Sequence, residues 1–119
     1  MISFELAREL KAAGFTQSTS LHAVYALNEH LRIRRQDALQ MWYGSKTKAG
    51  LALELEEEAV YAPTLPDLVT ACAKPLQLAC DEAGNWKAST PISGRQLVGE
   101  GETADESLAR LWLLMLRST

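Results

Sequence analysis

The chain has 119 residues, 47% of them hydrophobic, and a formal net charge of −3 at pH 7. This length and composition exclude wholesale disorder and collagen-like repeats, and we expect one compact domain spanning residues 1–119. Fifteen acidic residues stand against twelve Lys and Arg. The acidic balance excludes a strongly basic nucleic-acid-binding coat, although a local basic patch remains open.

Hydrophobic runs and cysteines bear on the compartment. The longest uninterrupted apolar run covers residues 111–116, far short of the roughly 20 residues that cross a bilayer. The N-terminus shows neither a basic start nor a long apolar stretch, so we expect no signal peptide, no membrane contact and a cytoplasmic location. Cys72 and Cys80 cannot form a disulfide framework, and we expect both to be buried free thiols.

Three segments carry the signals of a helix start. Ser3, Thr64 and Thr103 each stand where a side-chain oxygen can cap the first turn, and Glu106 completes a capping box with Thr103. Gly14 stands where the first helix needs a left-handed stop. The sequence predicts helices over residues 3–13, 64–73 and 103–117.

The last of these helices is apolar on more than one face. Leu108, Leu111 and Met115 form one stripe, whereas Leu113 and Leu114 point away from it. The helix is therefore either buried between layers or exposed on one side as an interface. Leu113 and Leu114 are candidate residues for a protein interface, and a homodimer through this side is one hypothesis.

Alternating apolar and polar residues predict strands in the remaining segments. Residues 20–43 contain no Gly or Pro, and their apolar residues fit either the two-residue period of a strand or the period of a helix. A period of two gives two strands around a turn at residues 28–30, and a helical period gives two helices. We favour a hairpin followed by a short helix over residues 36–43. The predicted fold class is α+β, a small antiparallel sheet with about three helices packed on one face. Its strands come from segments near residues 21–34, 51–61, 76–90 and 96–98, and Leu78 and Trp86 are among the residues expected in its core.

A basic stretch covers residues 32–48, where the only acid is Asp37. Its pattern has some likeness to the turn and recognition helix of helix-turn-helix DNA readers, but Arg32 occupies the position where that turn has Gly. DNA binding is therefore the alternative function, and a solvated strand face is the simpler interpretation. The cations of the stretch are Arg32, Arg34, Arg35, Lys46 and Lys48. The candidate nucleic-acid contacts are Arg32, Arg34, Arg35, Gln36 and Gln40.

The inventory for catalysis and cofactor binding is poor. His22 and His30 are the only histidines, and no nucleophile elbow or phosphate-binding glycine loop is present. The densest carboxylate cluster, Glu54 with residues 56–58, alternates with leucines and is expected to face water. We expect no enzyme activity, no metal and no cofactor.

Two aromatic residues precede a glycine loop and a pair of lysines. Trp42 and Tyr43 are either core residues or exposed contacts for a partner. We include them, with Leu113 and Leu114, among the candidate residues of a protein interface.

Three blocks in order carry a resemblance to a known family. They are FELARELKAAGFTQ at residues 4–17, VYAPTLPDLVTAC at 60–72, and WKA at 86–88 followed by GETADESLARLWL at 101–113. This order resembles a family of small uncharacterised phage and prophage proteins, which implies a cytosolic setting and no established activity. The closing block is also similar to the strand-to-helix ending of HicB-type antitoxins. The leading hypothesis is a non-enzymatic interaction protein of phage or prophage origin that acts through protein–protein contacts.

Overall fold

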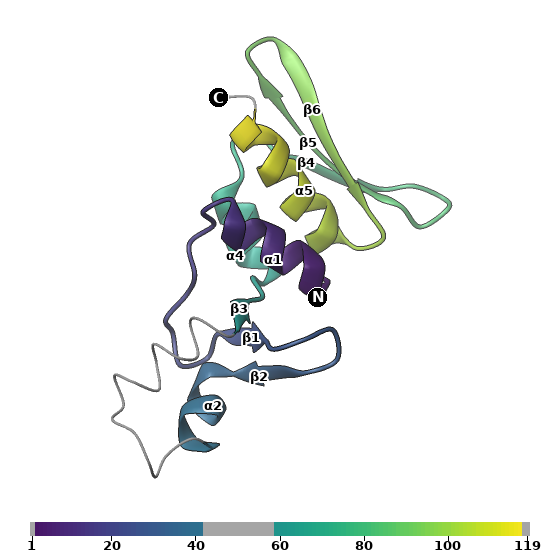
Figure 1. The fold of residues 1–119 in the computed structure, drawn as a ribbon. Helices are drawn as coiled ribbons and strands as arrows, with labels where there is room; N and C mark the ends of the chain where they lie inside the picture. Colours follow the sequence, from purple (N-terminus) through teal and green to yellow (C-terminus); the bar gives the residue numbers. More distant parts are fainter. Residues whose placement is uncertain (1, 42–58, 118–119) are drawn as a thin grey trace. The chain divides into compact units, whose positions relative to one another are not determined.

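The structure is a computed structural model that describes residues 2–41 and 59–117. The predicted α+β class is confirmed, but the strands form two antiparallel three-stranded sheets instead of one (Figure 1). The elements run in the order α1 (Phe4–Ala12), β1 (Val24–Ala26), β2 (Arg32–Arg34), α2 (Arg35–Met41), β3 (Val60–Tyr61), α4 (Leu65–Ala71), β4 (Gln77–Cys80), β5 (Trp86–Ile92), β6 (Arg95–Gly101) and α5 (Ala104–Arg117).

The chain divides into two compact units, and each holds one of the sheets. The first unit is Ser3–Pro63, and the second joins Met1–Ile2 to Thr64–Thr119. Each unit is described by itself below. The single domain expected over residues 1–119 stays a prediction.

Helix α1 begins and ends where its local signals predict. The Ser3 hydroxyl accepts a hydrogen bond from the Leu6 N–H at 3.2 Å, which satisfies one of the first free donors of the helix. Gly14 follows the helix with a φ of +94°, a conformation that a residue with a Cβ adopts at a cost. The Phe15 N–H then donates to the Leu10 carbonyl at 2.9 Å, and Phe15 is buried.

The hairpin predicted within residues 21–34 is confirmed. Strand β1 pairs antiparallel with β2 on one side and with β3 on the other. The Asn28 Oδ1 accepts from the N–H groups of His30 and Leu31 at 2.8 Å each, so this side chain organises the turn. Helix α2 follows β2 directly, beginning at Arg35 rather than at the predicted residue 36. Of the predicted strand at residues 51–61, residues 51–58 lie outside the described part of the chain.

The second unit is a three-stranded meander preceded in the chain by α4 and followed by α5. Helix α4 begins with the predicted cap, where the Thr64 hydroxyl donates to the Asp67 carboxylate at 3.0 Å. Strands β4, β5 and β6 pair antiparallel in chain order. The connection between the strand segments predicted near residues 76–90 and 96–98 consists of Ser93 and Gly94, whose φ values of 51° and 79° are those of a type I′ turn. The strand predicted at residues 96–98 therefore extends over all of β6.

Helix α5 packs over β5 and β6 and also against α4 (Figure 1). Leu108 and Leu111 are fully buried. Gly99 of β6 lies so close to α5 that an added Cβ would collide with the backbone of Ser107 and Leu111. The glycine thus lets the helix backbone approach the sheet, which fixes where α5 sits and which strands it covers.

Candidate functional site

Strand β4 is an uncovered edge of the second sheet. The strand order places β4 at one side of β5, and all four of its residues are exposed. Leu78, expected in the core, is 36% exposed, so that expectation is wrong. The physical reason is the position of α5, which packs over β5 and β6.

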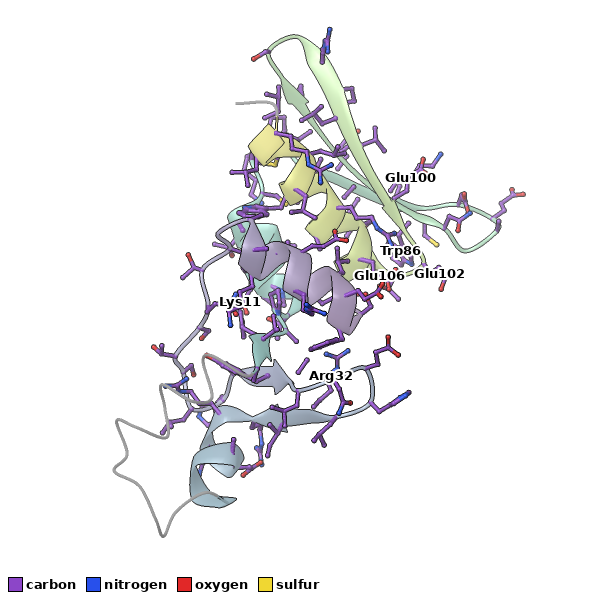
Figure 2. All side chains as sticks on the ribbon, in the orientation of Figure 1. Lys11, Arg32, Trp86, Glu100, Glu102 and Glu106 are labelled. Atoms are coloured by element: carbon purple, nitrogen blue, oxygen red, sulfur yellow. The ribbon has the colours of Figure 1, made fainter. Side chains whose placement is uncertain are left out.

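The register of the sheet shows which face the β4 side chains share. Leu78 pairs with the fully buried Ala88, and Cys80 pairs with the half-buried Trp86. These four residues therefore lie on the face that α5 covers further along the sheet. Trp86 is also paired with Gly101 and lies near the start of α5, as Figure 2 shows. We call Leu78, Cys80 and Trp86 the β4 surface.

The backbone of β4 offers unused hydrogen-bonding groups along its outer side. The Asp81 N–H donates to the Asn85 carbonyl at 2.9 Å, which makes these two residues a hydrogen-bonded pair. Such pairs alternate along an antiparallel ladder, so Ala79 also bonds to β5, whereas the backbone groups of Leu78 and Cys80 point away from it. No described strand pairs with that side. A row of outward N–H and C=O groups is a template for an added strand.

The other edge strand of this sheet, β6, differs from β4 in its backbone contacts and in its charge. Arg110 of α5 donates from Nη1 to the backbone oxygen of Glu100 at 2.6 Å, so a helix side chain occupies a carbonyl of that strand. Strand β6 also carries the charges of Arg95 and Glu100, and charges on an edge discourage pairing with another chain. Strand β4 has the sequence Gln-Leu-Ala-Cys and no charge. Of the two edges, β4 is the one that fits strand addition.

The two thiols have opposite environments. Cys72 is buried as predicted, with its Sγ 3.7 Å from the Leu108 carbonyl oxygen. Burial raises the pKa of the Cys72 thiol above its ordinary value, and the nearby charge of Lys74 offsets only part of that shift. The prediction that Cys80 is buried is wrong, because Cys80 lies on the uncovered strand.

The thiol environments give a first testable result. A thiolate-selective reagent at pH 8 should modify Cys80 rapidly and Cys72 only slowly, because Cys72 is buried and less ionised. Pulsed alkylation followed by peptide mass spectrometry measures both rates, and we expect them to differ by on the order of tenfold or more. Denaturant should abolish the difference. Equal rates in the folded protein would contradict the exposed position of β4.

The fold places some of the candidate nucleic-acid contacts on the surface and others in the interior. Arg34 is exposed and forms an ion pair with Asp37 at 3.1 Å. Arg35 is only 6% exposed, donates from Nη1 to the Tyr25 hydroxyl at 3.2 Å, and holds its guanidinium 5.7 Å from the centre of the Tyr25 ring. Arg35 is therefore part of the interior of its unit.

The helix-turn-helix geometry is wrong for this segment. Residues 24–26 and 32–34 are strands, so the first helix of such a motif is absent there. Arg32 is half-buried in β2, and Gln36 is exposed in the first turn of α2, its N–H bonded to the Leu21 carbonyl at 3.0 Å. The side chain of Gln40, together with Lys46 and Lys48, lies outside the part that the structure describes.

The structure also corrects the exposure expected for the candidate interface residues. Leu113 is only 7% exposed and Leu114 is half-buried. The burial of Leu113 contradicts an exposed interface there, because α5 packs against both the sheet and α4 and so has more than one packed face. Trp42, Tyr43 and the carboxylate cluster of Glu54 with residues 56–58 lie outside the described residues.

Other chemistry is sparse in the described residues, 2–41 and 59–117. His22 and His30 are both exposed. Within these ranges no group of three or more His, Cys, Asp or Glu is placed to hold a metal ion. None of the helices in the same ranges has the length and apolar character needed to cross a membrane. The absence of enzyme activity and of a cofactor stays a prediction.

Comparison with known proteins adds no assignment. No protein-family model, curated protein or solved structure matches the chain. The resemblance to phage and prophage proteins, and the similarity of the closing block to HicB-type antitoxins, stay predictions.

Proposed function

We propose that this chain is a non-enzymatic interaction protein that binds another polypeptide by adding a strand along β4. The observation that carries the proposal is the uncovered, uncharged edge strand with Leu78 exposed at its centre. Strand addition uses backbone hydrogen bonds for affinity and side-chain pockets for selectivity. The outward groups of Leu78 and Cys80 supply the first of these, and the β4 surface supplies the second.

The fold around β4 supports this role because the strand is held from one side. The Thr90 hydroxyl of β5 donates to the Pro75 carbonyl at 2.8 Å, which keeps the chain before β4 in line with the strand. Four pairs of residues then join β4 to β5. An incoming strand would therefore meet an edge that is already extended, which lowers the ordering cost of binding.

DNA binding, the alternative from the sequence, gains no comparable observation. Arg35 contacts Tyr25 in the interior, and the exposed Arg34 is paired with Asp37. DNA binding therefore stays a prediction, and no geometry of the described residues carries it further.

Site-specific photo-crosslinking tests the proposed function. A benzophenone amino acid at Ala79 places the probe on exposed β4, on the face opposite α5. The matched control places the same probe at Gln96, which is exposed on β6 of the same sheet. In the cell that encodes the protein, we expect protein adducts from position 79 and few from position 96. Mass spectrometry locates the linked residues. No adduct from position 79, or equal yields from both positions, would contradict strand addition at β4.

A further inference from the structure

We propose that the strand added to β4 is the β4 strand of a second copy of this chain, antiparallel and centred on Leu78. This inference rests on the proposed function and names its partner. It follows from the backbone pattern of the edge and from the charges at its two ends.

The backbone pattern allows β4 to pair with itself. A two-fold axis perpendicular to the sheet pairs identical edges antiparallel and keeps each face on its own side. Because Leu78 directs its N–H and C=O outward, Leu78 and the same residue of the second copy can exchange both hydrogen bonds. Leu76 and Cys80 have the same outward parity and would form the flanking pairs. The two sheets would then join into one continuous antiparallel sheet.

Several registers keep the α5-covered faces of the two copies on the same side of the joined sheet. The charges at the two ends of β4 favour the register centred on Leu78. Lys74 precedes the strand, and Asp81 and Glu82 follow it. The Lys74 ammonium donates to the Val69 carbonyl at 2.8 Å, which keeps the positive charge at that end of β4. Centring the pair on Leu78 brings the end of β4 next to Lys74 in one copy toward the end next to Asp81 and Glu82 in the other, twice over by symmetry. Opposite charges at facing ends attract each other.

The apolar side chains point to the same arrangement. Leu78 and Cys80 lie on the α5 side of the sheet beyond the strands that α5 covers. Pairing places the two copies of Leu78 side by side there, and each removes apolar surface of the other from water. The contact is short, since β4 has four residues, so the dimer is expected to be weak and concentration-dependent.

Mixed crosslinking of two probes, each with one exposed cysteine beside the buried Cys72, tests the register. In this register Gln77 faces Ala79 of the second copy, in a pair without direct hydrogen bonds whose Cα atoms are about 4.5 Å apart, within disulfide reach. The probes are Gln77→Cys and Ala79→Cys, each combined with Cys80→Ser. Mild oxidation of their mixture should give disulfide-linked heterodimers on the order of tenfold faster than either protein gives homodimers, because like positions are offset by two residues. A mass tag on one protein identifies the heterodimer.

The controls separate this inference from the proposed function. Leu78→Lys places two charges at the symmetry axis and should abolish the heterodimer, while circular dichroism reports that the fold is kept. Sedimentation of the unaltered chain should show mass rising above 13.1 kDa with concentration. Equal crosslinking in the mixture and in the separate proteins, or a monomer at every concentration, overturns the self-pairing. If the benzophenone at Ala79 then links only other proteins, strand addition at β4 stands and self-pairing fails. If the benzophenone links no protein, both strand addition and self-pairing fail.

Discussion

We expect Gly99→Ala to destabilise the second unit by about 3 kcal/mol. The Cβ of alanine would meet the backbone carbonyl of Ser107 and the backbone nitrogen of Leu111. Backbone atoms of a helix cannot rotate aside as a side chain can, so α5 must move away from β6. That movement opens the packing around Leu108 and Leu111, which are fully buried. For a unit of this size the midpoint of thermal unfolding should fall by on the order of 10 °C or more.

A second glycine provides the control for Gly99. Gly84 lies in the turn between β4 and β5 with a φ of +87°, and an added Cβ there meets no atom within 4 Å. Gly84→Ala should therefore cost only the strain of a left-handed residue, about 1 kcal/mol. Thermal unfolding and hydrogen exchange of the β5 and β6 amides compare the two variants. Equal losses of stability in the two variants would show that the close contact between α5 and β6 does not restrict the residue at position 99.

The helix starts were predictable because their signals are local. The hydroxyls of Ser3 and Thr103 accept hydrogen bonds from backbone N–H groups in their own first turns. The hydroxyl of Thr64 instead donates to the Asp67 carboxylate. Such contacts join residues three positions apart, so the sequence alone contains both partners.

Exposure was harder to predict because it depends on elements that are distant in the chain. Alternation predicted a strand through Leu78 and favoured a core position for this residue, but it could not show that α5 packs over β5 and β6 instead of β4. For the same reason the sequence left open whether Leu113 is buried between layers or exposed, and the packing of α5 on two sides buries it. Gly99 and Gly101 lie beyond the strand predicted at residues 96–98, and both are strand residues that lie against the last helix. The candidate site followed from these distant contacts and could not be found by motif.

The basic stretch shows how neighbouring residues of one type acquire different roles. Arg34 and Arg35 are adjacent and were predicted together as nucleic-acid contacts. Arg34 ends β2 with its side chain exposed, whereas Arg35 begins α2 with its side chain buried against Tyr25. The strand-to-helix junction falls between them and turns the two side chains to different environments.

We therefore expect Arg35→Ala to destabilise the first unit by about 2–4 kcal/mol, whereas Arg34→Ala should cost less than about 1 kcal/mol. Truncating Arg35 removes the hydrogen bond to the Tyr25 hydroxyl, the cation over its ring, and a buried aliphatic stem. Truncating Arg34 removes an exposed ion pair with Asp37. Hydrogen exchange of the β1 and β2 amides reports the stability of this unit separately from the other.

The contacts of Tyr25 decide between a structural and a binding role for Arg35. The Tyr25 hydroxyl also donates to the Ser18 carbonyl at 2.6 Å, so it links the chain before β1 to the start of α2. Tyr25→Phe should accelerate exchange in the same amides as Arg35→Ala, and the double variant should cost less than the sum, because both single changes break one shared contact. Additive losses would show that Arg35 stabilises the unit without Tyr25. Unchanged exchange in Arg35→Ala would return Arg35 to the list of residues available for nucleic acid.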